Sequence, residues 1–146
     1  MNQTQTEART VQAVLKGKEI TVAAPESIEE LASRGYGTKQ NKKLTLTLYE
    51  SLYLLSKDII EVSEQRGKKK TTFRQLLNTY KTTDPNAWAK YLIYRDLRSR
   101  GYVAREGFGV GTDFRVYERG EYGTQTAKYL IFGIQEGQPV TMQQLA

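Results

Sequence analysis

The chain has 146 residues, 38% hydrophobic and 26% charged, which suffices for one sizeable domain or two small domains that share an interface. No apolar run approaches the length that crosses a bilayer, and the start, MNQTQTEART, is polar, so we expect a cytoplasmic protein without a membrane segment. The chain has no cysteine and no histidine, so we expect no disulfide, no metal and no cofactor. The net charge of +6 suits a polyanionic partner, although a basic surface also keeps a small domain soluble.

The first part of the chain predicts a hairpin and a helix. Residues 10–22 alternate around Gly17 in the manner of a short β-hairpin, with Val11, Ala13 and Leu15 on one face. Residues 25–35 predict a helix that opens with a capping box from Ser27 to Glu30. The segment that follows, GYGTKQNKK, predicts a loop.

Two more helices are predicted before residue 82. Thr47 and Glu50 form another capping box, followed by an amphipathic helix with leucines at i, i+4 and i+7. A short strand follows in IIEVSEQ, and TTFRQLLNTYK predicts a helix with its apolar side chains on one face. The N-terminal half therefore predicts a mixed α/β domain, residues 1–82.

The second half, residues 83–146, predicts a separate domain. Asp84 is a suitable N-cap, Pro85 suits the first helical position, and Gly101 would end the helix. We expect three side chains of this helix to point inward, namely Trp88, Tyr91 and Leu92. Three strands follow, in GYVAREGF, TDFRVYERG and AKYLIFGI, and PVTMQQLA predicts the start of a further helix, as if the C-terminal element were incomplete.

The run YLIYRDLRSRGYVAREGFGVGTDFRVYERG, followed by AKYLIFGIQEG, resembles the C-terminal nuclease domain of the archaeal tRNA-splicing (tRNA-intron) endonuclease family. The upstream segment LTLTLYESLYLLSKDIIEV resembles the N-terminal domain of the same family, so the likeness covers most of residues 10–146. It implies an α/β (α+β) fold with a restriction-endonuclease-like C-terminal domain. GFGVG alone would indicate only a turn at the end of a strand.

The resemblance implies metal-free cleavage, in which the ribose 2′-hydroxyl attacks the adjacent phosphate to give a 2′,3′-cyclic phosphate and a 5′-hydroxyl. The family uses a tyrosine, a histidine and a lysine, because the hydroxyl needs a base and the phosphate needs a cation. The tyrosine matches Tyr117, and the histidine position matches Thr126, whose hydroxyl does not titrate near neutrality. The family lysine would lie beyond Ala146. Lys128 is protonated at neutral pH, so it would contact phosphate rather than act as the base.

The missing histidine implies a structural subunit that works with a catalytic partner chain in a heterotetramer, cutting precursor tRNA at bulge-helix-bulge junctions. The resemblance also implies a subunit contact through the loop that contains Glu136. Arg98 is a candidate RNA contact, although a cation at a helix C-terminus is stabilising without any ligand. Two alternatives stay open: an active subunit in which another group replaces the base, and a general RNA-binding module.

Overall fold

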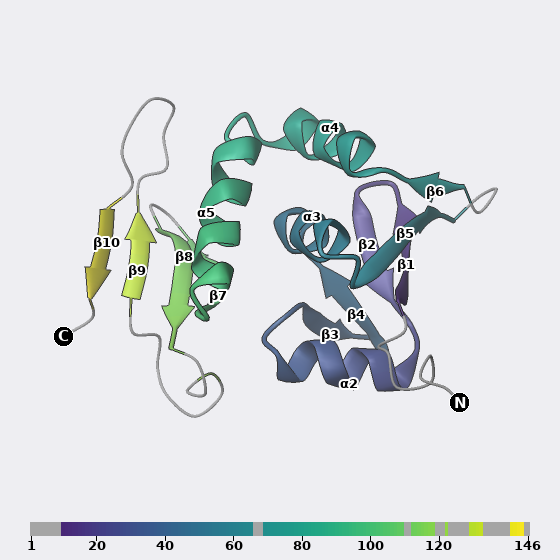
Figure 1. The fold of residues 1–146 in the computed structure, drawn as a ribbon, viewed down its shortest axis with the longest axis horizontal. Coiled ribbons are helices and arrows are strands. Elements are labelled where there is room, and N and C mark those ends of the chain that lie inside the picture. Colours follow the sequence, from purple (N-terminus) through teal and green to yellow (C-terminus); the bar gives the residue numbers. More distant parts are fainter. Residues whose placement is uncertain are drawn as a thin grey trace.

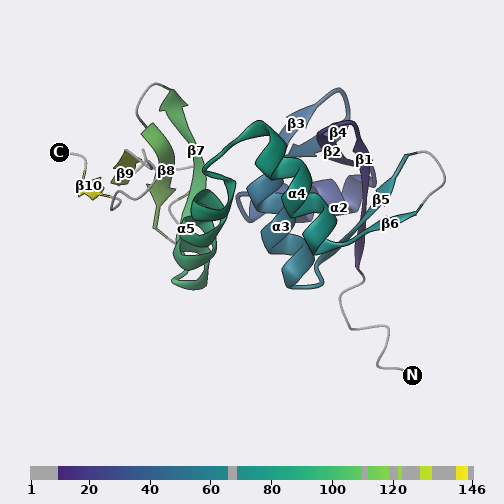
Figure 2. The same cartoon turned by 90° about the horizontal axis from the view of Figure 1, so that it is seen from above.

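A computed structural model describes residues 10–65, 69–109, 112–118, 122, 129–132 and 141–144 of the chain. Within these residues the fold is mixed α+β and has two lobes, each built on its own β-sheet (Figure 1). Helix α5 (Ala87–Ser99) lies between the sheets, against α3 and α4 on one side and β7 on the other (Figure 2). No helix in the described part of the chain is both long enough and apolar enough to span a bilayer.

The N-terminal lobe carries a sheet that the described residues build in the order β3-β4-β2-β1-β5-β6. Its strands are β1 (Val11–Lys16), β2 (Glu19–Val22), β3 (Thr38–Gln40), β4 (Lys43–Leu46), β5 (Ile60–Glu64) and β6 (Lys70–Thr71). Its helices are α2 (Pro25–Ser33), α3 (Leu48–Ser56) and α4 (Phe73–Thr83). The predicted hairpin around Gly17 is confirmed as β1 and β2, and β1 also pairs in parallel with β5.

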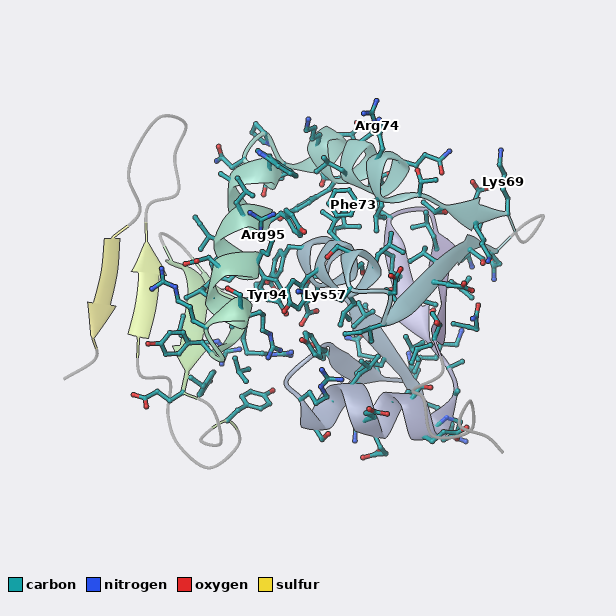
Figure 3. All side chains as sticks on the ribbon, in the orientation of Figure 1. Lys57, Lys69, Phe73, Arg74, Tyr94 and Arg95 are labelled. Atoms are coloured by element: carbon teal, nitrogen blue, oxygen red, sulfur yellow. The ribbon has the colours of Figure 1, made fainter. Side chains whose placement is uncertain are left out.

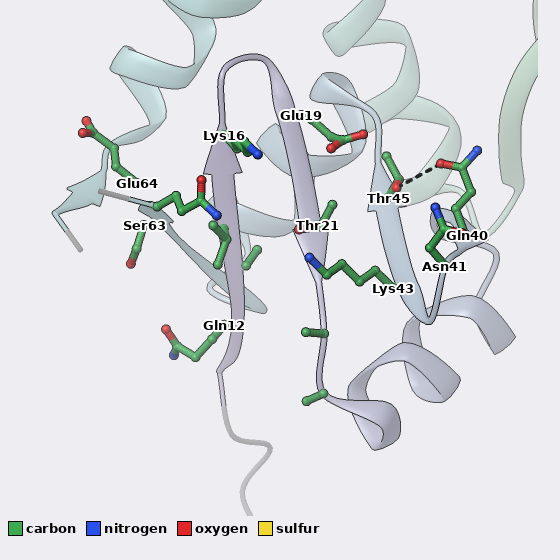
Figure 4. A pocket seen from close by; sticks show the side chains of 15 residues that line it. Gln12, Lys16, Glu19, Thr21, Gln40, Asn41, Lys43, Thr45, Ser63 and Glu64 are labelled. Carbon is green, nitrogen blue, oxygen red and sulfur yellow. Dashed lines mark hydrogen bonds between the residues drawn. The ribbon is translucent and has the colours of Figure 1, made fainter. Parts of the chain in front are cut away.

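One face of this sheet is apolar and the other is open to solvent. Ala13 is buried between the exposed Gln12 and Val14, the alternation expected of a strand with one covered face. The open face holds a shallow hollow of about 820 Å³ with polar side chains around it, among them Lys16 and Lys43 (Figure 4). The sheet therefore directs its apolar face toward the helices and the second lobe.

The C-terminal lobe is an antiparallel sheet in the order β10-β9-β8-β7. Its strands are β7 (Val103–Gly109), β8 (Thr112–Tyr117), β9 (Tyr129–Phe132) and β10 (Thr141–Gln144). The three strands predicted after α5 are confirmed. The helix predicted in PVTMQQLA is wrong, since Thr141–Gln144 pairs with β9 as a strand. The edge of β9 supplies backbone partners that outweigh the helical preference of so short a segment.

Two of the predicted helix starts are wrong. Helix α2 begins at Pro25 after Ala24, and no side chain caps it. Proline fits the first helical position, so the helix starts before Ser27. Helix α5 begins after Asn86, while Asp84 is extended and ends α4. The extended backbone at Asp84 follows from the proline next to it, which disfavours a helical conformation in the preceding residue.

The capping box at α3 is confirmed, because the Thr47 hydroxyl accepts from the Glu50 amide at 3.2 Å and the Glu50 carboxylate accepts from the Thr47 amide at 2.9 Å. The loop predicted after Gly35 is wrong, because residues 38–46 form the hairpin of β3 and β4. Its turn places Asn41 and Lys42 at φ 50° and 66°. These left-handed values suit a tight hairpin turn, and the sequence lacked the glycine that usually signals one.

Aromatic side chains join the two lobes into one core. The Tyr49 ring on α3 lies 4.9 Å from Tyr94 on α5 and 5.2 Å from Phe114 on β8, between ring centroids. Tyr53 meets Tyr94 edge-on at 5.7 Å. The buried cluster extends from the first sheet through α3 and α5 to β8. Of the three side chains of α5 predicted to point inward, Tyr91 is buried and Leu92 is partly buried against the core, but Trp88 is 44% exposed. The buried face of α5 consists of Ala87, Tyr91, Tyr94 and Leu97.

Candidate functional site

Tyr117 lies at the end of β8, opposite Val103 of β7. Phe114 and Val116 are buried on the face toward α5, and Tyr117 shares the other face with Arg115, since side chains two apart on a strand point the same way. The Tyr117 ring is buried and meets Tyr122 edge-on with 5.1 Å between centroids. The packing thus fixes the ring of the predicted catalytic tyrosine.

Arg115 holds the hydroxyl of Tyr117. Its Nη1 donates to the phenol oxygen at 3.1 Å, and its Nε donates to the carbonyl oxygen of Glu106 at 2.7 Å. Because the guanidinium always donates, the phenol oxygen acts as the acceptor in this contact and its proton is available to another group. The arrangement also puts a permanent positive charge beside the hydroxyl, as a phosphate would require.

A cavity of about 500 Å³ opens between the lobes beside Tyr117. Val103 and Tyr122, the two neighbours of Tyr117, both line it. The wall from the other lobe comes from the end of α2 and from α3. The remaining lining residues are Ser33, Arg34, Tyr36, Tyr53, Arg98, Gly101 and Tyr102. Two arginines and several phenol rings therefore surround a space next to the predicted catalytic position.

Arg98 is held in this cavity by aromatic rings. Its guanidinium carbon lies 3.9 Å from the centroid of the Tyr36 ring, and its Nε donates to the Tyr94 hydroxyl at 3.2 Å. Its Nη2 is buried and has no hydrogen-bond partner among the described residues. Burial raises the pKa of both Tyr36 and Tyr94, so both phenols are protonated at neutral pH. That Arg98 contacts RNA stays a prediction.

Arg105 of β7 ties the site to the N-terminal lobe. Its Nη1 donates to the carbonyl oxygen of Gly35 at 2.7 Å and to the Glu50 carboxylate at 3.3 Å, and its Nη2 donates to the carbonyl oxygen of Gly37 at 2.7 Å. The Tyr122 ring lies 5.8 Å from the guanidinium. No local sequence signal predicts this contact, because the capping box of α3 already accounts for Glu50.

The other predicted site residues, Thr126, Lys128 and Glu136, lie outside the described residues. Their predicted roles therefore stay predictions. Across the described ranges, no three acidic side chains gather closely enough to hold a metal ion. The described part of the site thus consists of Tyr117, the two arginines Arg98 and Arg115, and the cavity between the lobes.

Two family models match this chain, and they describe the N-terminal and C-terminal domains of one enzyme family. The model described as "tRNA intron endonuclease, N-terminal domain" matches residues 11–77, and the model described as "tRNA intron endonuclease, catalytic C-terminal domain" matches residues 87–146. The chain therefore belongs to the tRNA intron endonuclease family. The resemblance predicted from the sequence motifs is confirmed at the level of this family.

Curated relatives carry the name tRNA-splicing endonuclease. The protein of Methanococcus maripaludis is 34% identical over 123 residues, which cover 84% of this chain and 69% of the relative. The protein of Pyrococcus furiosus is 31% identical over 132 residues, covering 90% of this chain and 75% of the relative. The protein of Thermococcus gammatolerans is 45% identical over 87 residues, which cover 60% of this chain and 51% of the relative.

Proposed function

We propose that this chain is a cytoplasmic structural subunit of a tRNA-splicing endonuclease, which cuts precursor tRNA at bulge-helix-bulge junctions together with a histidine-bearing catalytic partner. The observation that carries the proposal is the absence of histidine from a chain of this family. A ribose 2′-hydroxyl is a poor nucleophile at neutral pH and needs a nearby base. Threonine, the residue at the family's histidine position, does not supply one.

The proposed cleavage requires no metal, and its products carry a 2′,3′-cyclic phosphate and a 5′-hydroxyl. In the active subunits of the assembly, a tyrosine, a histidine and a lysine move the protons and stabilise the phosphate charge. In this chain Tyr117 occupies the tyrosine position without the histidine. We infer that the chain supplies shape and RNA contacts while the partner supplies the chemistry.

The loop that contains Glu136 is the proposed contact between the dimers of a heterotetramer. The resemblance implies that such an acidic loop enters a basic pocket of a neighbouring subunit. The cavity between the lobes supports a pocket of this kind, because Arg34 and Arg98 line it and the Arg98 Nη2 is buried without a partner among the described residues. A carboxylate would satisfy that donor with a charge-assisted hydrogen bond.

The assembly test compares two carboxylates of this chain. Glu136→Ala should lower the mass of the complex with the catalytic partner from tetramer to dimer, measured by light scattering. Glu26→Ala, at an exposed position on α2, should leave the mass unchanged. A tetramer that persists in the Glu136 variant would remove this contact from the proposal.

The activity test uses the purified chain, the purified catalytic partner and their mixture. We expect an intron-containing precursor tRNA to stay intact with this chain alone and to be cut by the mixture. The products should carry cyclic phosphate ends. Turnover by the purified chain on its own would overturn the structural role.

The position of Arg115 favours a second candidate, an active subunit in which another group replaces the histidine. The guanidinium orients the Tyr117 hydroxyl at 3.1 Å and adds a positive charge beside it, which an inactive chain does not need. Lys128 is the candidate group from the sequence, and its position lies outside the described residues. Substitution of Tyr117 separates the two candidates.

A further inference from the structure

Trp88 exposes a flat aromatic surface on α5. It is the chain's only tryptophan, and 44% of it is exposed. Its ring rests against Tyr91, with 5.5 Å between centroids and 33° between the ring planes. Tyr91 is itself buried and is held edge-on by Phe73 of α4 at 5.4 Å. The indole is therefore supported from one side and open on the other.

Arg95 lies on the same face of the helix as Trp88. The two residues are seven positions apart, which is close to two helical turns, and Tyr91 lies between them. The Arg95 side chain is exposed, and its guanidinium carbon lies 5.8 Å from the centroid of the Tyr91 ring. Figure 3 shows the Arg95 side chain on the side of α5 that faces α4, where Phe73 also lies. An aromatic plane and a cation thus share one rigid support.

This face of α5 continues toward the candidate site. Arg98 follows Arg95 at i+3 and lines the cavity beside Tyr117, so the distance from Trp88 to Arg98 along the helix is about 15 Å. The Nζ of Lys57, the residue that follows α3, lies 5.8 Å from the ring of Tyr53, which lines the same cavity. Asp96 of α5 is paired with Arg100 at 3.1 Å. Apart from Asp96, whose charge Arg100 balances, the charged residues named along this path are positive, which suits a phosphate backbone.

We propose that Trp88 and Arg95 form a binding site for one unpaired nucleotide of an RNA substrate, with the base stacked on the indole and its phosphate against the guanidinium. The proposal rests on the function proposed above and adds the place where the RNA enters. Stacking on an aromatic ring accepts any base, because every base has a π face, so the site selects unpaired nucleotides rather than a sequence.

The surface fits a nucleotide better than an apolar peptide. A helical or extended peptide needs several apolar anchors in a row. Among the described residues only Trp88 and Val14 are large, apolar and exposed. Val14 lies on β1 in the N-terminal sheet, away from α5. Aromatic rings next to basic side chains are a combination that proteins use to bind single-stranded nucleic acid, and Trp88 with Arg95 offers one such pair.

The only tryptophan gives the site its own signal. We expect a short oligouridylate to quench the fluorescence of Trp88 in the purified chain, and we expect added salt to reverse the quenching. Arg95→Ala, which keeps the fluorophore, should weaken binding and reduce the slope of log K against log salt by about 0.7, the value for one phosphate contact. Lys18→Ala, an exposed charge in the β1–β2 turn, is the matched control and should leave that slope unchanged.

Trp88→Ala should weaken the binding of a labelled oligouridylate about five-fold or more, measured by anisotropy. Val14→Ala, at the other exposed apolar side chain, should not weaken it. Unchanged affinity in the Trp88 variant, or quenching by a polyglutamate peptide but not by RNA, would overturn the site. The function proposed above has its own readout, since a mixture with the catalytic partner that never cuts precursor tRNA would overturn that function whatever the fluorescence shows.

Discussion

Glu50 and Arg105 are 55 positions apart in the chain and form an ion pair across the two lobes at 3.3 Å. The side chain of Glu50 is 3% exposed and that of Arg105 is 13% exposed. Glu50 also accepts hydrogen bonds from the backbone amides of Thr47 and Gly37, and Arg105 donates to two backbone carbonyls. The pair therefore connects the start of α3, the segment after α2 and strand β7.

Replacing Glu50 by glutamine should lower the free energy of unfolding by about 3 kcal/mol, because a buried guanidinium would lose its counter-charge. Urea denaturation followed by circular dichroism measures the change. Asp96→Asn, which breaks the exposed pair with Arg100, is the control and should cost less than about 1 kcal/mol. Equal effects of the two substitutions would contradict the importance of burial.

Gly35→Ala should destabilise the chain by more than Gly17→Ala. Gly35 and Gly17 both have positive φ, 86° and 64°, so alanine at either position strains the backbone and lowers the free energy of unfolding. A Cβ at Gly35 would lie 2.5 Å from the Val103 side chain, whereas a Cβ at Gly17 would meet nothing within 4 Å. We expect a loss of about 1 kcal/mol at Gly17 and about 2 to 4 kcal/mol at Gly35, since overpacking adds to the strain. Similar losses would show that the lobes separate easily at Val103.

Thr71→Val should raise the stability of the chain by about 1 kcal/mol. The Thr71 hydroxyl on β6 is buried and has no hydrogen-bond partner within the ranges that the structure describes. Valine has a similar shape and removes a polar group whose burial is unfavourable. Thermal melting provides the measurement. A lower melting temperature would mean that the hydroxyl has a partner in solution.

The chain should lose stability as the pH rises above about 10. Burial raises the pKa of Tyr36 and Tyr94, so above the ordinary pKa of tyrosine the unfolded chain releases protons that the folded chain retains. Below that pH both states are protonated, and these groups add no pH dependence. Urea midpoints measured from neutral to alkaline pH should fall less steeply for Tyr36→Phe than for the unchanged chain. Identical slopes would show that Tyr36 titrates normally.

Tyr117→Phe should leave the rate of precursor cleavage by the reconstituted complex unchanged if only the partner chain is catalytic. The variant removes the hydroxyl that accepts from Arg115 and keeps the ring packed on Tyr122. A stability loss of about 1 kcal/mol is expected from the lost hydrogen bond and serves as the check that the substitution acts. A fall in the rate of a folded complex would favour the active-subunit candidate.

The order of elements after residue 10 could be predicted well because periodicity and capping are local signals. The Thr47–Glu50 box and the strand alternation in β1 are examples. The hairpin of β3 and β4 was missed because its turn uses Asn41 and Lys42 without a glycine. The strand at residues 141–144 was predicted as a helix because its pairing with β9 depends on residues outside the segment.

The candidate site was predictable only where a motif named a residue. Tyr117 follows from its place in the FRVY motif. The contact of Arg115 with Tyr117 and the cavity around Arg98 depend on how the two lobes meet, which no single segment specifies. Arg98 was expected to be stabilised by the end of its own helix. Its contact with the Tyr36 ring involves the segment after α2, which is far from Arg98 in the chain.

The contact of Tyr49 with Tyr94 and Phe114 has a consequence for how such proteins vary. Each half of the chain completes the hydrophobic core of the other. A break in the polypeptide between α4 and α5 would therefore leave two fragments with exposed, aggregation-prone aromatic surfaces. We expect such pieces to be recovered only when they are produced together. Exchange of one half between relatives would then require compensating changes at these three rings.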